Sequence, residues 1–207
     1  MTIKVLNLYC GIGGNRMLWK DVEVTAIEIN EDIAGAYKSN FPQDEVIVGD
    51  AHQYLLDHYK EFDFIWSSPP CPTHSVLNYS MPLKRYPSMI LWQEILFLKS
   101  WFKGKWVIEN VKSYYEALVK PTVFLGRHPY WSNFDIPEKE FTNVDVARST
   151  AEELSKDLGI PIPKIQKARL LLRNCVHPEM GLHIFKSAFK ELQEKLRFSD
   201  IEGNKNK

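Results

Sequence analysis

The sequence predicts an α/β fold in which helices cover both faces of a mostly parallel sheet. Two features indicate this fold class. Short apolar runs rich in β-branched residues recur through the first half of the chain, and segments long enough to form helices separate them. The chain has 207 residues, 44% of them apolar and 25% charged, and this composition suits one globular domain with its own core.

Five runs in the first half of the chain are predicted as strands: residues 3–9, 22–29, 45–48, 62–66 and 106–108. Residues 89–101 form too long a run for a strand and are apolar nearly all round, so we predict a buried helix there. The alternation loosens after Val111, and residues 130–136 are the next predicted strand.

Two helices are predicted in the second half. Ser149 is expected to begin the first, since Glu152 lies three residues on as in a capping box, and Gly159 is expected to end it before the proline-punctuated loop at 160–163. The last helix is expected to be amphipathic and to pack on the sheet. Its apolar residues recur at helical spacing, at Leu182, Phe185, Phe189, Leu192 and Leu196.

Composition restricts the possible functions. Lysine and arginine number 26, as do aspartate and glutamate, so the net charge of zero neither favours nor excludes nucleic acid as a partner. Cys10, Cys71 and Cys175 are far apart and the histidines form no metal-like pair, which predicts no disulfide framework and no metal. No apolar stretch approaches the ~18 residues of a membrane span, and the N-terminus has no secretion-signal pattern. We therefore expect a cytoplasmic protein without membrane contact.

The segment YCGIGG follows the first predicted strand and is expected to precede a helix. Its glycines allow a tight turn and close approach to a ligand, and ligands of parallel sheets bind beyond the carboxyl ends of strands. Glu28, after the second strand, could accept hydrogen bonds from ribose hydroxyls, and Asp50, after the third, could bind an adenine amino group. The alternatives are a turn without a ligand and two acids that cap helices or lie solvated in loops. The spacing of Gly11, Gly13 and Gly14 differs from G-x-G-x-x-G, which argues against a nicotinamide enzyme.

The segment SSPPCPTHS, at residues 67–75, is the most informative part of the sequence. Prolines on both sides of Cys71 stiffen the backbone at the end of the fourth strand, where the ligand cleft is expected. A thiol held there suits a nucleophile that attacks electrophilic carbon. The alternative is a buried cysteine that serves only packing.

Four segments, in chain order, resemble motifs of the cytosine carbon-5 methyltransferases. YCGIGG resembles their first motif, SSPPCPTHS resembles their Pro-Cys catalytic motif, and ENV at 109–111 is identical to their Glu-Asn-Val motif. RNCVHP, at 173–178, is similar to their final Asn-x-Val motif. The resemblance covers residues 3–190 and implies a Rossmann-like class I methyltransferase fold with S-adenosylmethionine as the cofactor.

The resemblance also implies roles for individual residues. Cys71 would add to carbon 6 of cytosine, and Glu109 would hydrogen-bond ring nitrogen 3 and the exocyclic amine. The family's Gln-x-Arg-x-Arg motif, which contacts the cytosine carbonyl, is absent, and Arg127 is the candidate to replace it, with a structural role as the alternative. The residues expected to bind the cofactor are Tyr9, Gly11, Ile12, Gly13, Gly14, Glu28, Ile29, Asp50, Ala51, Pro70, Asn174 and Val176.

Double-stranded DNA is the expected partner, with the target base flipped out of the helix. Ser75 and Arg85, in a loop expected to close over that base, are candidates for DNA phosphate contacts. Residues 1–198 are expected to form a single methyltransferase domain, followed by a disordered tail at 199–207. The target-recognition insertion within this domain, at about 132–172, is small for the family. This small size predicts weak sequence preference or help from a partner. Such compactness resembles prokaryotic or phage-encoded enzymes, including those of restriction-modification.

Three other functions remain open. Amino-group methyltransferases carry an aromatic residue after Ser-Pro-Pro or Asp-Pro-Pro, so SPPC differs from their turn by one residue. They need no thiol, and replacement of Cys71 would separate the two mechanisms. A relative of the carbon-5 family methylates tRNA, which makes RNA a second possible substrate. The third alternative is an inactive relative that only binds DNA or the cofactor.

Overall fold

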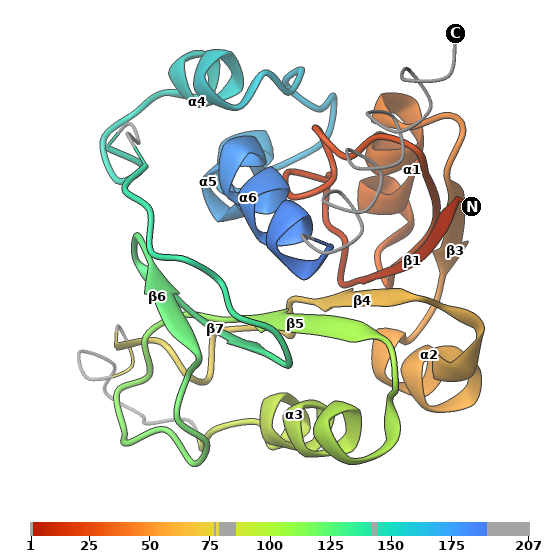
Figure 1. Ribbon diagram of the computed structural model, residues 1–207. Helices are drawn as coiled ribbons and strands as arrows, with labels where there is room; N and C mark the ends of the chain where they lie inside the picture. Colours follow the sequence, from red (N-terminus) through yellow and green to blue (C-terminus); the bar gives the residue numbers. More distant parts are fainter. Residues whose placement is uncertain (1, 77, 79–85, 142–144, 190–207) are drawn as a thin grey trace, which may run out of the picture.

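The computed structural model describes residues 2–76, 78, 86–141 and 145–189. Within them, seven strands form one sheet in the order β3-β2-β1-β4-β5-β7-β6 (Figure 1). The first five strands pair in parallel, whereas β7 runs antiparallel to both β5 and β6. The strands are β1 (Ile3–Leu8), β2 (Val22–Glu28), β3 (Glu45–Val48), β4 (Phe64–Ser67), β5 (Lys105–Glu109), β6 (Val123–Leu125) and β7 (His128–Ser132).

Helices cover both faces of this sheet, as predicted. The helices are α1 (Glu31–Asn40), α2 (Ala51–His58), α3 (Ile90–Trp101), α4 (Ala151–Leu158), α5 (Ala168–Asn174) and α6 (Pro178–Ala188), and a short 3-10 turn, η1 (Tyr59–Glu61), follows α2. In Figure 1, α1, α5 and α6 lie on one side of the sheet, and α2 and α3 lie on the other. The predicted Rossmann-like α/β architecture is confirmed.

The alternation of side chains along each strand explains the two apolar layers. On β4, Phe64 and Trp66 join the core cluster that contains side chains of α1 and α6, whereas Ile65 joins the cluster beneath α2 and α3. All residues of β4 are buried, which is typical of a parallel strand covered on both faces. The apolar face of α3 meets the second layer through side chains that include Trp92 and Leu98.

The segment YCGIGG, at residues 9–14, forms what we call the glycine turn. The helix expected directly after this turn is not present. Three successive turns replace it: the N–H groups of Gly13, Arg16 and Trp19 donate to carbonyls three residues earlier. Gly13 has φ +87°, which a right-handed helix does not allow, and the first helix begins only after β2, at Glu31.

The second half differs from the prediction in its strands. The strand expected at 130–136 is β7, which begins and ends earlier, and β6 had no recognised signal. The two form a hairpin whose turn contains Gly126, at φ +56°. Pro129 lies inside β7. Proline lacks the N–H that a strand donates, so its presence in the sequence argues against a strand, and β6 has only three residues.

The last predicted helix corresponds to α6, which contains Leu182 and Phe185 and is capped by Phe189. Leu192 and Leu196 lie outside the described residues, as does the expected tail at 199–207.

The capping box of α4 lies one residue later than predicted. Thr150, and not Ser149, accepts a hydrogen bond from an N–H of the first turn, and Glu153, and not Glu152, reciprocates to the Thr150 N–H. Gly159 ends the helix with φ +64°, as predicted.

Replacing Thr150 with Ala is expected to lower the free energy of unfolding by about 1 kcal/mol, because the Glu153 N–H in the first turn loses the hydroxyl oxygen to which it donates. Urea denaturation followed by circular dichroism measures the change. Glu152→Gln is the matched control and should change stability by less than about 0.5 kcal/mol. A larger loss for Glu152→Gln than for Thr150→Ala would contradict this position of the box.

Candidate active site

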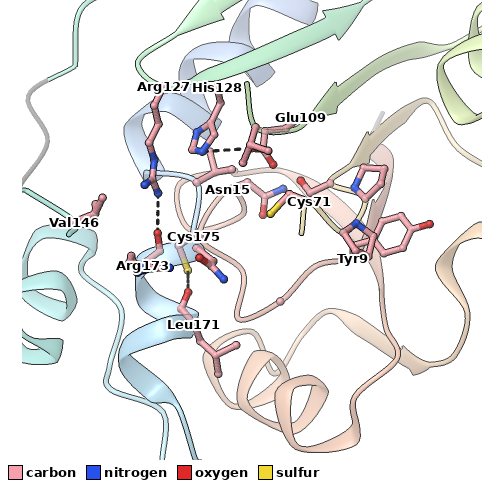
Figure 2. Close-up of a pocket in the computed structure, with 18 of the residues that line it drawn as sticks. Tyr9, Asn15, Cys71, Glu109, Arg127, His128, Val146, Leu171, Arg173 and Cys175 are labelled. Atoms are coloured by element: carbon pink, nitrogen blue, oxygen red, sulfur yellow. Dashed lines mark hydrogen bonds and ion pairs between the residues drawn. The ribbon is translucent and has the colours of Figure 1, made fainter. Parts of the chain in front are cut away.

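A cleft of about 1090 Å³ opens at the carboxyl ends of β1, β2, β4 and β5 (Figure 2). The strand order reverses between β1 and β4, which is where open α/β sheets bind ligands. The predicted site residues that line it are Tyr9, Gly11, Ile12, Gly14, Glu28, Pro70, Cys71, Ser75, Glu109, Arg127, Asn174 and Val176. Segments far apart in the sequence therefore meet in one cavity.

Four predicted site residues are described but do not line the cleft. Gly13 packs against the rings of Phe41 and Tyr37, Ile29 is 72% exposed, and Ala51 is buried in the first turn of α2. Asp50 caps α2, since its Oδ1 accepts hydrogen bonds from the N–H groups of His52 and Gln53. Arg85 lies outside the described residues.

The glycine turn is shaped by close contacts. A Cβ on Gly13 would lie 2.2 Å from a ring carbon of Phe41, and a Cβ on Gly14 would lie 2.5 Å from the carbonyl oxygen of Val176. Glycine at position 14 thus allows the last predicted motif to pack against the first. Tyr9 is held at φ 54°, in the left-handed region that non-glycine residues rarely adopt.

Glu28 connects the glycine turn to the start of α1. Its Oε2 accepts a hydrogen bond from the Gly11 N–H at 3.2 Å, and its Oε1 accepts one from the Asn30 N–H at 3.0 Å. A carboxylate has about four acceptor sites, so it retains capacity for ribose hydroxyls while it makes these two bonds.

A buried carboxylate that the sequence analysis missed supports this end of the sheet. Glu94 of α3 is fully buried and accepts hydrogen bonds from the Tyr9 hydroxyl at 2.7 Å and the Ser67 hydroxyl at 2.6 Å. His52 Nδ1 lies 3.1 Å from the same carboxylate, and this hydrogen bond raises the pKa of His52. An acid in the middle of a largely apolar helix was the available signal.

Asn110 fixes the loop that carries Cys71, a role that the sequence analysis did not assign. Its side chain is almost fully buried, and its Nδ2 donates to the Pro69 carbonyl at 2.9 Å. Its Oδ1 accepts from the Val111 N–H. The Asn of ENV thus joins the end of β5 to the segment before the cysteine, and the motif itself was the signal.

The Cys71 thiol lies in the cleft and is half-buried (Figure 2). Burial raises its pKa, and the nearby Glu109 carboxyl raises it further. Arg127 and Arg173 act in the opposite direction without reversing the shift. The resting thiol is therefore protonated at neutral pH and must lose its proton to become a nucleophile.

Glu109 is suited to hold a proton near neutral pH. Burial raises its pKa to about 7, although a hydrogen bond from Ser68 and the charge of Arg127 both favour the ionised form. The Ser68 hydroxyl also accepts from Trp66 Nε1 at 3.0 Å, which fixes its orientation. The site thus pairs a thiol with an acid that changes protonation in the physiological range.

Arg127 and His128 face different groups, as Figure 2 shows. Arg127 Nη2 donates to the Arg173 carbonyl at 2.9 Å, whereas His128 Nε2 lies 3.7 Å from Glu109 Oε1. Burial and the charge of Arg127 lower the pKa of His128 to about 4, so its imidazole is neutral at pH 7. The role predicted for Arg127 stays a prediction, and the group beside Glu109 is His128.

Two general observations concern the described part of the chain. It contains no group of three or more His, Cys, Asp or Glu residues arranged to hold a metal ion. None of its helices is both long and apolar enough to cross a membrane.

Comparison with a curated protein gives a local sequence match. A stretch of 78 residues, 34% of this chain, is 36% identical to a Spodoptera frugiperda protein named tRNA (cytosine(38)-C(5))-methyltransferase. The match covers 24% of that protein, so the chain spans about a quarter of the length of the curated relative it matches.

Solved structures give partial matches. A putative methyltransferase from Escherichia coli has a TM-score of 0.45 and 15% identity, over 64% of this chain and 75% of that one. A mutant of DNMT2 from Spodoptera frugiperda has a TM-score of 0.44 and 24% identity, over 68% of this chain and 54% of that one.

The family comparison covers the part of the cleft that contains Cys71 and Glu109. Residues 3–119, more than half of the chain, match the family described as C-5 cytosine-specific DNA methylase. This region includes the glycine turn, Cys71 and Glu109. The chain therefore belongs to the C-5 cytosine-specific DNA methylase family.

Proposed function

We propose that the protein transfers a methyl group from S-adenosylmethionine to carbon 5 of cytosine in DNA, through a covalent adduct with Cys71. One observation carries the proposal: a single cleft is lined by a thiol, an acid with a raised pKa, and the glycine turn bonded to Glu28. Neither a binding module nor an amino-group methyltransferase needs a thiol beside such an acid.

The two catalytic residues overcome the low nucleophilicity of carbon 5. The Cys71 thiolate adds to carbon 6, so a sulfur–carbon bond forms and the electrons of the 5,6 double bond move toward carbon 5 and nitrogen 3. Glu109 donates its proton to nitrogen 3, which stabilises this adduct as an enamine. After carbon 5 has taken up the methyl group, its proton passes to solvent and the sulfur–carbon bond breaks, which restores the 5,6 double bond and the thiolate. Nitrogen 3 then returns its proton to Glu109.

The cleft fits S-adenosylmethionine together with a base. Its volume of about 1090 Å³ is slightly above the usual range for a single small-molecule site, which leaves room for a second group beside the cofactor. A Cβ on Gly11 would meet no atom within 4 Å, so this residue faces open space. The bound cofactor supplies an electrophilic methyl group on a sulfonium ion. Glu28 would hold the ribose hydroxyls, and Asn174 and Val176 would close the pocket on the side of Gly14.

A small segment at 132–172 is proposed to contact the nucleic acid, within a single methyltransferase domain at 1–198. Val146 and Ala147 of this segment line the cleft, and Arg148 is exposed beside them. The backbone of Ser75 bridges to Ser113 at the cleft, where Ser75 would meet a phosphate. So small a recognition element favours a short target sequence or a partner that supplies specificity.

Transfer RNA is the second candidate substrate. The observation that favours it is the local match to a protein named as a tRNA cytosine carbon-5 methyltransferase. Both substrates would use Cys71 and Glu109 in the same way, so the choice between them rests on binding outside the base pocket.

Covalent trapping tests the proposal. Duplex DNA and tRNA transcripts that contain 5-fluorocytosine are incubated with labelled S-adenosylmethionine, and complexes are resolved under denaturing conditions. Fluorine blocks the final loss from carbon 5, so we expect the wild-type protein to be trapped on DNA and Cys71→Ala to give no trapped complex. Cys175→Ala is the matched control, since this second thiol also lines the cleft, and it should be trapped normally.

Each other outcome has a distinct meaning. Trapping on tRNA alone selects the second candidate. Methylation of unmodified DNA without any trapping contradicts the covalent mechanism and favours an amino-group methyltransferase. Absence of both labelling and trapping on either nucleic acid contradicts the proposed function and favours an inactive binding protein.

A further inference from the structure

His128 is the first residue of β7 and lies in the cleft beside Glu109 (Figure 2). Each of the two side chains is only 13% exposed. The distance of 3.7 Å between His128 Nε2 and Glu109 Oε1 exceeds the length of a hydrogen bond. The two side chains are therefore neighbours that do not hydrogen-bond to one another. The imidazole of His128 is therefore not committed to Glu109, and Glu109, which also accepts a hydrogen bond from Ser68, keeps capacity for a third group placed beside the two residues.

Arg127, the adjacent residue, is directed elsewhere. Its guanidinium donates to the carbonyl of Arg173, and the side chain is exposed. The β6–β7 turn thus separates the two residues: the arginine contacts the backbone at the end of α5, and the imidazole faces the acid.

The structure of cytosine indicates which atom of a bound base would lie next to Glu109. A cytosine that presents nitrogen 3 and its exocyclic amine to a carboxyl group carries the 2-carbonyl oxygen on the ring atom next to nitrogen 3. That oxygen is a strong acceptor and, in a buried site, needs a donor. A neutral imidazole has one N–H and can supply it, and at pH 7 His128 is neutral because burial lowers its pKa to about 4. A neutral donor also leaves the proton on Glu109 undisturbed.

We propose that His128 Nε2–H donates a hydrogen bond to the 2-carbonyl oxygen of the cytosine held by Glu109. This inference rests on the proposed function and adds to it a residue that contacts the substrate. His128 then helps to select a pyrimidine, since adenine has a carbon-bound hydrogen at the ring position that carries this oxygen in cytosine.

A cycle between residue and substrate atom tests the contact. Methyl-transfer rates are measured for the wild type and His128→Ala on a target cytosine and on 2-thiocytosine, whose sulfur is a weaker acceptor. We expect about a 3- to 10-fold loss in kcat/KM for the wild type when oxygen is replaced by sulfur. The kcat/KM of His128→Ala with cytosine should be lower than that of the wild type by a similar factor. Replacing oxygen by sulfur should then lower the kcat/KM of His128→Ala by less than about 2-fold, because the interaction is already absent.

Two further variants sharpen the test. His128→Gln retains an N–H donor and should recover part of the loss with cytosine. Arg127→Ala is the matched control. The factor by which this substitution lowers kcat/KM and the factor caused by replacing oxygen with sulfur should multiply, since Arg127 does not contact that oxygen.

Multiplicative losses in His128→Ala, with a shifted pH dependence of kcat, would overturn the contact and show instead that His128 acts through Glu109. Wild-type transfer to unmodified cytosine is the reference for the whole cycle. If neither DNA nor tRNA cytosine is methylated by the wild type, the proposed function itself fails, and this outcome differs from a failure of the His128 contact alone.

Discussion

Replacing Asp44 with Ala is expected to lower the free energy of unfolding by about 3–5 kcal/mol, because it leaves a buried arginine without its counter-charge. Asp44 and Arg16 are almost fully buried, with side chains 1% and 5% exposed. Arg16 Nε and Nη2 donate to the two carboxylate oxygens at 2.8 and 2.9 Å, a bidentate arrangement. The Tyr37 hydroxyl donates to the same carboxylate at 2.9 Å.

This ion pair connects the segment after the glycine turn, which lines the cleft, to the segment between α1 and β3. Arg16 follows the glycine turn, and its Nη1 also donates to the Trp19 carbonyl at 2.8 Å. Asp44 precedes β3, in the segment that follows α1. Loss of the pair should therefore loosen the glycine turn and weaken S-adenosylmethionine binding as well as the fold.

Urea denaturation followed by tryptophan fluorescence measures the stability loss. The matched control is Arg148→Gln, which removes an exposed ion pair with Asp145 and should change stability by less than about 1 kcal/mol. Arg16→Met combined with Asp44→Leu should recover most of the loss, since no uncompensated charge remains. A loss below about 1 kcal/mol in Asp44→Ala would show that the buried arginine finds another partner.

The sequence predicted the sheet well because its strands are local features. The run at 45–48 became β3 with the same bounds, since β-branched residues bounded by polar ones identify a short strand. The absent helix after the glycine turn shows the limit of local reasoning. There the inward-facing Arg16 and the contact between Gly13 and Phe41 decide the backbone, and both depend on residues far along the chain.

Motif order predicted which segments meet, but not which side chains touch. Twelve of the predicted site residues line one cleft. Nine of them lie at or after the carboxyl ends of parallel strands, whereas Arg127 comes from the β6–β7 turn, and Asn174 and Val176 come from the end of α5 and the segment after it. The partners of Asn110 and Glu94 could not be inferred, since the Pro69 carbonyl and the Tyr9 hydroxyl are distant in sequence. Likewise, the sequence could not show that Arg127 contacts the Arg173 carbonyl while the adjacent His128 lies beside Glu109, because both contacts depend on the backbone direction at the start of β7.

Replacing Glu109 with Gln is expected to stabilise the protein at alkaline pH while it removes most of the activity. Burial raises the pKa of Glu109 to about 7 in the folded state, above its ordinary value of 4.5. A raised pKa means that the folded protein binds the proton more tightly. The stability associated with this proton is fully present below about pH 4.5 and is lost as pH rises through about 7.

Glutamine resembles the protonated acid and cannot ionise, so Glu109→Gln should avoid this loss. Its advantage over the wild type should grow between pH 5 and 8 and reach up to about 3 kcal/mol, at about 1.4 kcal/mol per pKa unit. Urea denaturation at both pH values measures it. Glu138→Gln, at an exposed acid, is the control and should show no such pH dependence. A Glu109→Gln protein that is less stable than the wild type at pH 8 would contradict a raised pKa.

Activity should change in the opposite direction, because glutamine cannot give a proton to nitrogen 3. We expect kcat to fall by about 10²- to 10⁴-fold. In the wild type, a rising pH increases the Cys71 thiolate, whereas protonated Glu109 declines above about pH 7, so kcat/KM should rise with pH and level off near 7. The residual activity of Glu109→Gln should keep rising through that region, since only the thiol still titrates. Stability gained and activity lost at one position would show that the buried acid is retained for proton transfer, at a cost to the fold.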